Sequence, residues 1–152
     1  MDLVTGAAQA RGIHQVALIL KLFQNEVIAE QNLDSLSDKE KNGFVGLFFS
    51  FIVLRALAAE LALKVLYSQQ TGSDAVHSHD LSILFQALPR KTRDSISQRF
   101  QNMGRGKTIE DVFDAHKDDF IAWRYVYQDP HQHTGIGDLE AAIEATLEEF
   151  GA

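Results

Sequence analysis

Residues 37–68 constrain the fold most, because they form one long helical pattern that is apolar on more than one face. Ser37 and Glu40 have the spacing of a capping box, which predicts that a helix starts there. A helix of roughly 30 residues would be ~45 Å long. Its main apolar stripe consists of Phe44, Phe48, Phe51, Ala58, Leu61 and Val65, and further apolar residues lie elsewhere on the circumference. A helix that is apolar nearly all round is buried on several sides, so we expect it to be the central helix.

The rest of the chain shows the same helical periodicity and no convincing β alternation. Ile13, Val16, Leu20, Phe23 and Val27 recur at three- and four-residue steps and predict a helix over residues 13–31. Similar patterns predict helices over residues 80–88, 89–103, 108–127 and 138–150. The longest of these, 108–127, carries an aromatic seam that includes Trp123. We predict an all-α, up-and-down helical bundle of four main helices with short extra helices, in one domain over residues 1–152.

Composition excludes several classes of site. The 152 residues include no cysteine, which excludes disulfides, thiolate zinc sites and cysteine nucleophiles. The most apolar run, residues 44–54, is shorter than the ~20 residues that span a bilayer, so we expect no transmembrane helix. The N-terminus lacks the basic start of a secretory signal, and the default expectation is a soluble cytoplasmic protein.

Basic residues are concentrated in one segment of a chain whose net charge is −7. Residues 90–107 contain one acid, Asp94, and six basic residues: Arg90, Lys91, Arg93, Arg99, Arg105 and Lys107. One interpretation is a solvated helix face that ends in a basic loop. The other is a phosphate site made by Arg99, Arg105 and Lys107, because this loop leads into a predicted helix N-terminus that would favour anions. It is not a P-loop, since the Gly-x4-Gly-Lys-Ser/Thr pattern is absent.

Two charged residues interrupt the long apolar helix. Glu60 and Lys64 are an i, i+4 pair in the favoured order. On so apolar a helix they are expected to be partly buried, and a buried charge needs a partner. We expect Arg124 or His116 to supply that partner.

The segment before the predicted helix 80–88 contains a candidate cap. We expect Ser78 or His79 to cap this helix, Asp80 to favour its N-terminal dipole, and His79 to pack near Glu60. Glu60, Lys64, His79 and Asp80 are therefore interpreted as structural polar residues. The pairs His77/His79 and His131/His133 have no accompanying carboxylate motif, so no metal site is predicted.

Three local patterns in the second half of the chain are typical of one group of helical domains. They are Ala59-Glu60-Leu61-Ala62-Leu63-Lys64-Val65-Leu66, His79-Asp80-Leu81-x-x-Leu84-Phe85-x-x-Leu88 and Phe120-x-x-Trp123-Arg124-Tyr125-x-Tyr127. In this order the chain resembles the HEPN superfamily, small all-α domains often found beside minimal nucleotidyltransferases. The resemblance covers residues 44–128.

The resemblance implies a helical bundle that usually dimerises, and two functional branches. One branch comprises metal-independent ribonucleases, many of them toxins or phage-defence proteins, with an Arg-x4–6-His motif. Arg124 and His131, separated by six residues, match its loosest form and are the candidate catalytic pair. The other branch binds nucleotides or partner proteins. Tyr125 follows the arginine and Pro130 precedes the histidine, so the binding module is favoured.

The favoured function is thus a HEPN-like module that dimerises and binds a nucleotide, RNA or a partner protein, in a toxin–antitoxin or defence context. The alternative is a metal-independent endoribonuclease toxin that uses Arg124 and His131. Neither needs a cofactor or a metal. A nucleotidyltransferase-type antitoxin is an expected partner, and so is a second copy of the chain. The surface expected to join the homodimer is Phe44, Leu47, Phe48, Phe51 and Ile52.

Overall fold

The computed structural model describes residues 3–30, 35–119 and 136–151, and these residues are almost entirely helical. In chain order the elements are α1 (Leu3–Glu30), α2 (Asp38–Thr71), α3 (Leu81–Ala87), α4 (Arg90–Asn102), α5 (Ile109–Ala115), α7 (Ile136–Glu148) and a 3-10 turn, η3 (Glu149–Gly151). No strand occurs in these three segments. The predicted all-α class is confirmed.

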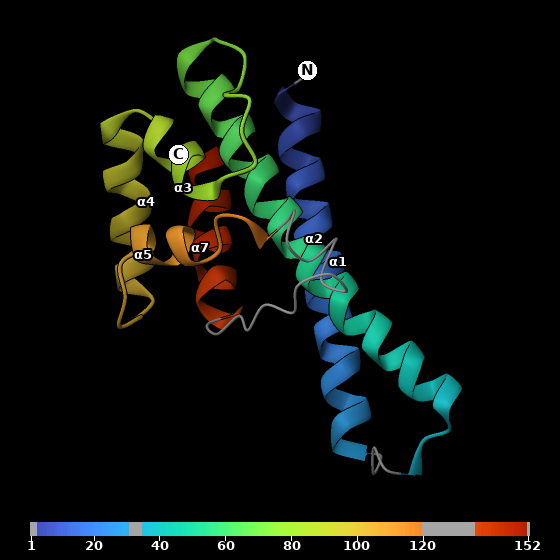
Figure 1. Ribbon diagram of the computed structural model, residues 1–152. Coiled ribbons are helices and arrows are strands. Elements are labelled where there is room, and N and C mark those ends of the chain that lie inside the picture. The colour runs from blue at the N-terminus through green and yellow to red at the C-terminus, as the bar shows by residue number, and fades with distance from the viewer. Residues whose placement is uncertain (1–2, 31–34, 120–135, 152) are drawn as a thin grey trace.

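The two longest helices, α1 and α2, form a hairpin that extends beyond the rest of the molecule. They run side by side, and α3, α4, α5 and α7 gather beside the end of the hairpin that contains the start of α1 (Figure 1). The other end, nearest the connection between α1 and α2, projects away from them (Figure 1). We call this projecting part, residues 16–30 and 38–54, the arm.

The main core lies where the second half of α2 meets the four shorter helices. Its buried α2 residues include Ala58, Ala62, Leu63 and Leu66, which pack with apolar residues of α3, α4, α5 and α7. The rings of Phe85 and Phe113 join α3 to α5, with centroids 5.2 Å apart. A separate small cluster in the arm consists of Phe51 and Ile52, packed against Leu20, Phe48, Phe49 and Val53. Helix α2 is therefore central to the part of the molecule outside the arm, which we call the body, as expected. The first half of α2 has few neighbours besides α1.

Local capping interactions define where several helices begin and end. The Ser37 side chain accepts a hydrogen bond from the Glu40 backbone N–H, and the Glu40 carboxylate accepts one from the Ser37 backbone N–H, so the predicted capping box is confirmed. Thr108 and Asp111 form the same arrangement at the start of α5. Gly72 ends α2 at a φ of +69°, a left-handed conformation that glycine adopts without a steric penalty.

Two predicted helix boundaries are wrong. The first helix begins at Leu3 rather than near residue 13, since small residues such as Ala10 pack it closely in the main core without a strong apolar pattern. Helix α5 ends at Ala115 rather than continuing to residue 127, because residues 116–118 form a turn. The Lys117 carbonyl in that turn accepts a 3.2 Å hydrogen bond from Leu81 N–H at the start of α3. The aromatic seam around Trp123 lies outside the described residues.

Among the described residues, α2 alone has the length and composition of a helix that could cross a membrane. This is weak evidence for a span, because a core helix of a water-soluble protein can pass the same test, and the second half of α2 is largely buried. The expectation that the chain has no transmembrane helix stays a prediction.

Candidate functional site

The candidate catalytic pair lies outside the part of the chain that the structure describes. Arg124 and His131 both fall within residues 120–135, as does His133. His77 and His79, the other histidine pair, are in the loop between α2 and α3. Within the described segments, no group of three or more histidine or carboxylate side chains is close enough to hold a metal ion.

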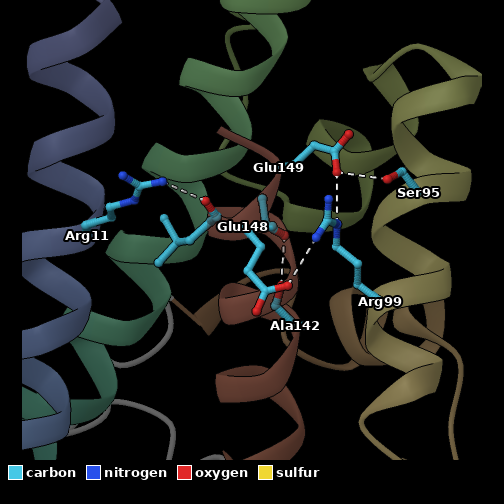
Figure 2. Close-up of polar contacts among 8 residues, drawn as sticks. Arg11, Ser95, Arg99, Ala142, Glu148 and Glu149 are labelled. Atoms are coloured by element: carbon cyan, nitrogen blue, oxygen red, sulfur yellow. Dashed lines mark hydrogen bonds and ion pairs between the residues drawn. The ribbon is translucent and has the colours of Figure 1, made fainter. Parts of the chain in front are cut away.

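Arg99, the first candidate phosphate-binding residue, is held by carboxylates at the end of α7. Figure 2 shows its side chain reaching from α4 to Glu148 and Glu149. The Arg99 Nη1 lies 3.3 Å from Glu148 Oε2, and its Nε donates to Glu149 Oε2 at 3.1 Å. The Ser95 hydroxyl donates to the same Glu149 oxygen at 2.9 Å. The positive charge of Arg99 is therefore compensated within the chain.

Arg105 and Lys107 lie near a carboxylate at the opposite end of α7. Arg105 Nη1 is 3.7 Å from Asp138 Oδ1, and Lys107 Nζ is 3.3 Å from Asp138 Oδ2. Asp138 is in the first turn of α7, whereas Glu148 is the last residue of that helix. The three candidate phosphate-binding residues thus do not converge on one point, and each has a carboxylate beside it.

Glu60 is the centre of a small ionic cluster on α2. Its side chain is nearly buried, and Lys64 Nζ lies 2.6 Å from Oε1. His79 Nδ1 lies 3.0 Å from both carboxylate oxygens, so the expected contact of His79 with Glu60 is present. These contacts join α2 to the loop before α3. His116, an expected partner of Glu60, instead contacts Asp119 through Nδ1 at 2.7 Å, because the turn after α5 brings a carboxylate within reach of the ring three residues along the chain.

Asp80 itself is the N-cap of α3, which corrects the expectation that Ser78 or His79 caps this helix. Its Oδ1 accepts a 3.0 Å hydrogen bond from Ile83 N–H. A carboxylate at the N-cap reaches this third backbone N–H and also favours the positive end of the helix dipole. The Ser78 hydroxyl accepts from Asp80 N–H at 3.0 Å and so braces the cap from outside the helix.

The most buried charge in the described residues is one that the sequence analysis did not single out. Arg55 on α2 is only 1% exposed, and its Nη2 lies 2.9 Å from Glu140 Oε1 on α7. Lys21 of α1 contacts the other oxygen of Glu140 at 2.5 Å. Burial lowers the pKa of Arg55 to about 9, which leaves the guanidinium charged at neutral pH. The sequence feature that could have indicated this ion pair is an arginine within the apolar part of a long helix, because a buried charge needs a partner.

His14 is a second buried polar residue that sequence reasoning missed. The side chain is 2% exposed, and within the described chain neither ring nitrogen has a hydrogen-bond partner. Its Nε2 lies 3.8 Å from Glu144 Oε1, which is beyond hydrogen-bond distance. Burial lowers the pKa of His14, an effect that the nearby Glu144 carboxylate opposes. The imidazole is therefore neutral at pH 7.

The arm carries the largest group of exposed apolar side chains among the described residues. Six of them are between 48% and 62% exposed: Val16, Ile19, Leu22, Phe23, Ile28 and Val45. We call these six residues the arm face. Val16, Ile19 and Phe23 have the i, i+3, i+7 spacing that places side chains on one side of a helix. His14 and Lys21 lie on the side of α1 that contacts α7. Val16 follows His14 by two residues, and Phe23 follows Lys21 by two residues. A step of two residues is about 200° around a helix. The stripe therefore faces away from α7.

Two of the five residues expected to join a homodimer are corrected by their burial, and the homodimer itself stays a prediction. Phe51 and Ile52 are each 4% exposed and pack within their own chain. Phe44, Leu47 and Phe48 are only partly exposed. Most of the open apolar surface is on α1, and it includes Val16 and Phe23, two of the residues whose spacing predicts that helix.

No known protein family, curated protein or solved structure matches this chain. The resemblance to HEPN domains therefore depends on its three sequence patterns. The first pattern lies on α2, the second includes the whole of α3, and the third lies entirely outside the described residues.

Proposed function

We propose that this chain is a non-catalytic helical interaction module, similar to the non-nuclease branch of HEPN domains, that binds protein through the arm face. The observation that carries the proposal is the position of this face. Large apolar side chains that are about half exposed gather on an arm that projects from the body. Exposed apolar surface of this kind marks interaction sites in water-soluble proteins.

The charge distribution supports binding to protein over binding to RNA or a nucleotide. Phosphate groups are bound by cations that are free to replace counterions. Arg99, Arg105 and Lys107 each lie near an α7 carboxylate, and the chain as a whole carries a charge of −7. A protein partner, such as the nucleotidyltransferase-type antitoxin that the resemblance implies, therefore fits the surface better than a polyanion does.

The test is an RNA incubation in the presence of EDTA, with the wild-type chain and the variants His131→Ala and Arg124→Lys. We expect no cleavage above the background of a mock preparation for any of the three. EDTA-resistant cleavage that both substitutions abolish, while the circular dichroism spectrum stays unchanged, would overturn the proposal and establish the ribonuclease alternative. Fluorescence anisotropy with a labelled RNA would show whether the chain binds RNA without cleaving it.

A further inference from the structure

We propose that an open hollow between α1 and α7 is a binding site for an organic primary ammonium ion. The hollow has a volume of about 430 Å³ and is lined by Arg11, His14, Gln15, Glu144, Leu147 and Glu148. We call it the α1–α7 hollow. It shares no residue with the arm, so this inference does not depend on the proposed function. A buried imidazole, a carboxylate without a strong cation beside it, and the number of acceptors around the hollow each support the inference.

The imidazole of His14 is a buried hydrogen-bonding group on the wall of this hollow. Its side chain is 2% exposed, and neither ring nitrogen has a hydrogen-bond partner within the described chain. Burial lowers the pKa of His14, so the ring is neutral at pH 7 and one of its two nitrogens is an acceptor. A buried acceptor that no donor reaches destabilises the fold. An N–H group of a bound ligand would remove that penalty.

The carboxylate of Glu144 lies opposite this ring. Its Oε1 is 3.8 Å from His14 Nε2, which is too far for a direct hydrogen bond. Among the described residues, no lysine or arginine forms an ion pair with Glu144. Glu144 is one turn before the last residue of α7, near the negative end of the helix dipole, and α7 has no basic residue in its last turn. This position therefore favours a cation from outside the chain.

The cations of neighbouring helices have other partners. Lys21 and Arg55 contact Glu140, which is one turn before Glu144 on α7. Arg11 lines the hollow, but Figure 2 shows its side chain reaching from α1 to the end of α7. There its Nη2 donates to the backbone carbonyl of Leu147 at 3.1 Å. The guanidinium of Arg11 thus compensates the helix end, and the space between His14 and Glu144 stays open to a ligand.

The number and kind of acceptors indicate the class of cation. A primary ammonium group has three N–H donors. The His14 nitrogen, the Glu144 carboxylate and the Gln15 amide oxygen supply three acceptors from two helices. A divalent metal ion fits less well, because the described residues contain no group of three histidine or carboxylate ligands. The hollow is much larger than the about 30 Å³ of one water molecule, so a short alkyl chain can lie against Leu147.

The experiment is an NMR titration of the isotope-labelled full chain with n-butylammonium chloride, at neutral pH and constant ionic strength. We expect saturable shift changes around the hollow, including the His14 ring nitrogens, with a dissociation constant on the order of 1 to 10 mM. Tetramethylammonium carries the same charge without an N–H donor, and n-butanol has the same chain without a charge. Both should bind at least about tenfold more weakly, because charge-assisted hydrogen bonds are the strong ones.

Two variants and a matched control assign the binding to this hollow. Glu144→Gln and His14→Phe should each weaken n-butylammonium binding by about tenfold, because each removes one acceptor of the ammonium group. Glu26→Gln is the control, because Glu26 is exposed on the same helix as His14 and lies ~18 Å further along it. It should keep the wild-type dissociation constant. If His14→Phe does not fold, Glu144→Gln decides alone.

Three outcomes would overturn the inference. The absence of saturable shifts up to about 50 mM ligand would mean that the hollow holds water only. Equal binding of tetramethylammonium would mean that charge alone attracts the ligand to an acidic protein. A dissociation constant unchanged in Glu144→Gln would place the binding elsewhere on the molecule.

Discussion

The guanidinium of Arg55 lies 2.9 Å from the carboxylate of Glu140, and both side chains are buried where α2 meets α7. Lys21 contacts the other carboxylate oxygen from α1. One carboxylate therefore joins the two hairpin helices to the last long helix of the chain. Because α7 also supplies Asp138 and Glu148 to the basic segment, and the η3 turn that follows it supplies Glu149, the placement of α7 controls how much positive charge this segment exposes.

Replacing Glu140 should be the most destabilising single polar substitution in this cluster. Glu140→Gln removes the charge of a carboxylate that lies 2.9 Å from a guanidinium that is 1% exposed, and breaking a buried ion pair costs about 3–5 kcal/mol of unfolding free energy. Urea unfolding followed by circular dichroism measures the change. Glu148→Gln is the control on the same helix, because Glu148 is exposed and its loss should cost no more than about 1 kcal/mol.

The double variant Arg55→Met/Glu140→Gln separates a buried-charge effect from a packing effect. Removing the buried cation as well should restore a large part of the stability lost in Glu140→Gln, since the remaining cation beside residue 140, Lys21, is 36% exposed and can be hydrated. A double variant less stable than either single variant would show that packing of the arginine stem around Phe51, whose ring centroid is 5.1 Å from the guanidinium carbon, is the larger contribution.

His14 should make the protein less stable as the pH falls. Burial lowers its pKa in the folded state below the unfolded value of about 6.5. As the pH drops through 6.5, the unfolded chain takes up the proton more readily than the folded chain, so protonation favours unfolding. His14→Gln removes this contribution. The wild type should therefore lose stability relative to His14→Gln between pH 8 and pH 5 in thermal melts.

The control for this pH effect is His77→Gln, because His77 is exposed in the loop after α2. Its difference from the wild type should stay constant over the same pH range. If the difference between the wild type and His14→Gln is equally constant, then His14 is not protonated differently in the two states and its buried position has no consequence for stability.

Helix starts could be predicted from the sequence because their signals are local. Ser37 and Glu40, or Thr108 and Asp111, are three residues apart, and their backbone and side-chain hydrogen bonds need no distant partner. The end of α5 could not be predicted in this way. The turn at residues 116–118 is accompanied by a hydrogen bond from Leu81 to Lys117, which depends on how α3 packs beside α5.

The exposure of one side of α1 and the carboxylates beside the basic segment could not be predicted from the sequence for a related reason. Val16 and Phe23 have the spacing of core residues, and spacing does not say whether another element covers that side. Arg99 is compensated by Glu149, which is 50 residues away in sequence. Charge patterns along the chain describe single segments, whereas the net charge of a surface depends on the segments that fold against it.

Asp80→Ala should destabilise the fold by about 1 kcal/mol, the usual loss when a helix N-cap side chain is removed. The carboxylate accepts a hydrogen bond from Ile83 N–H, and α3 is too short to compensate for a frayed first turn. Asp74→Ala, at an exposed loop position, is the matched control and should leave the urea midpoint unchanged. Equal effects of the two substitutions would mean that the Asp80 cap contributes nothing in solution.

Removing the α7 carboxylate from Arg105 and Lys107 should create the anion-binding surface that the sequence pattern suggested. Asp138→Asn leaves the two cations 3.7 Å and 3.3 Å from an uncharged side chain, so both become available to phosphate groups. We expect labelled RNA to bind this variant more tightly than the wild type at low salt, by roughly tenfold for two phosphate contacts, with a steeper salt dependence. Asp74→Asn makes the same change in net charge at an exposed loop position and controls for long-range electrostatics. If Asp138→Asn and Asp74→Asn bind RNA equally, compensation by α7 is not what keeps the basic segment from binding phosphate.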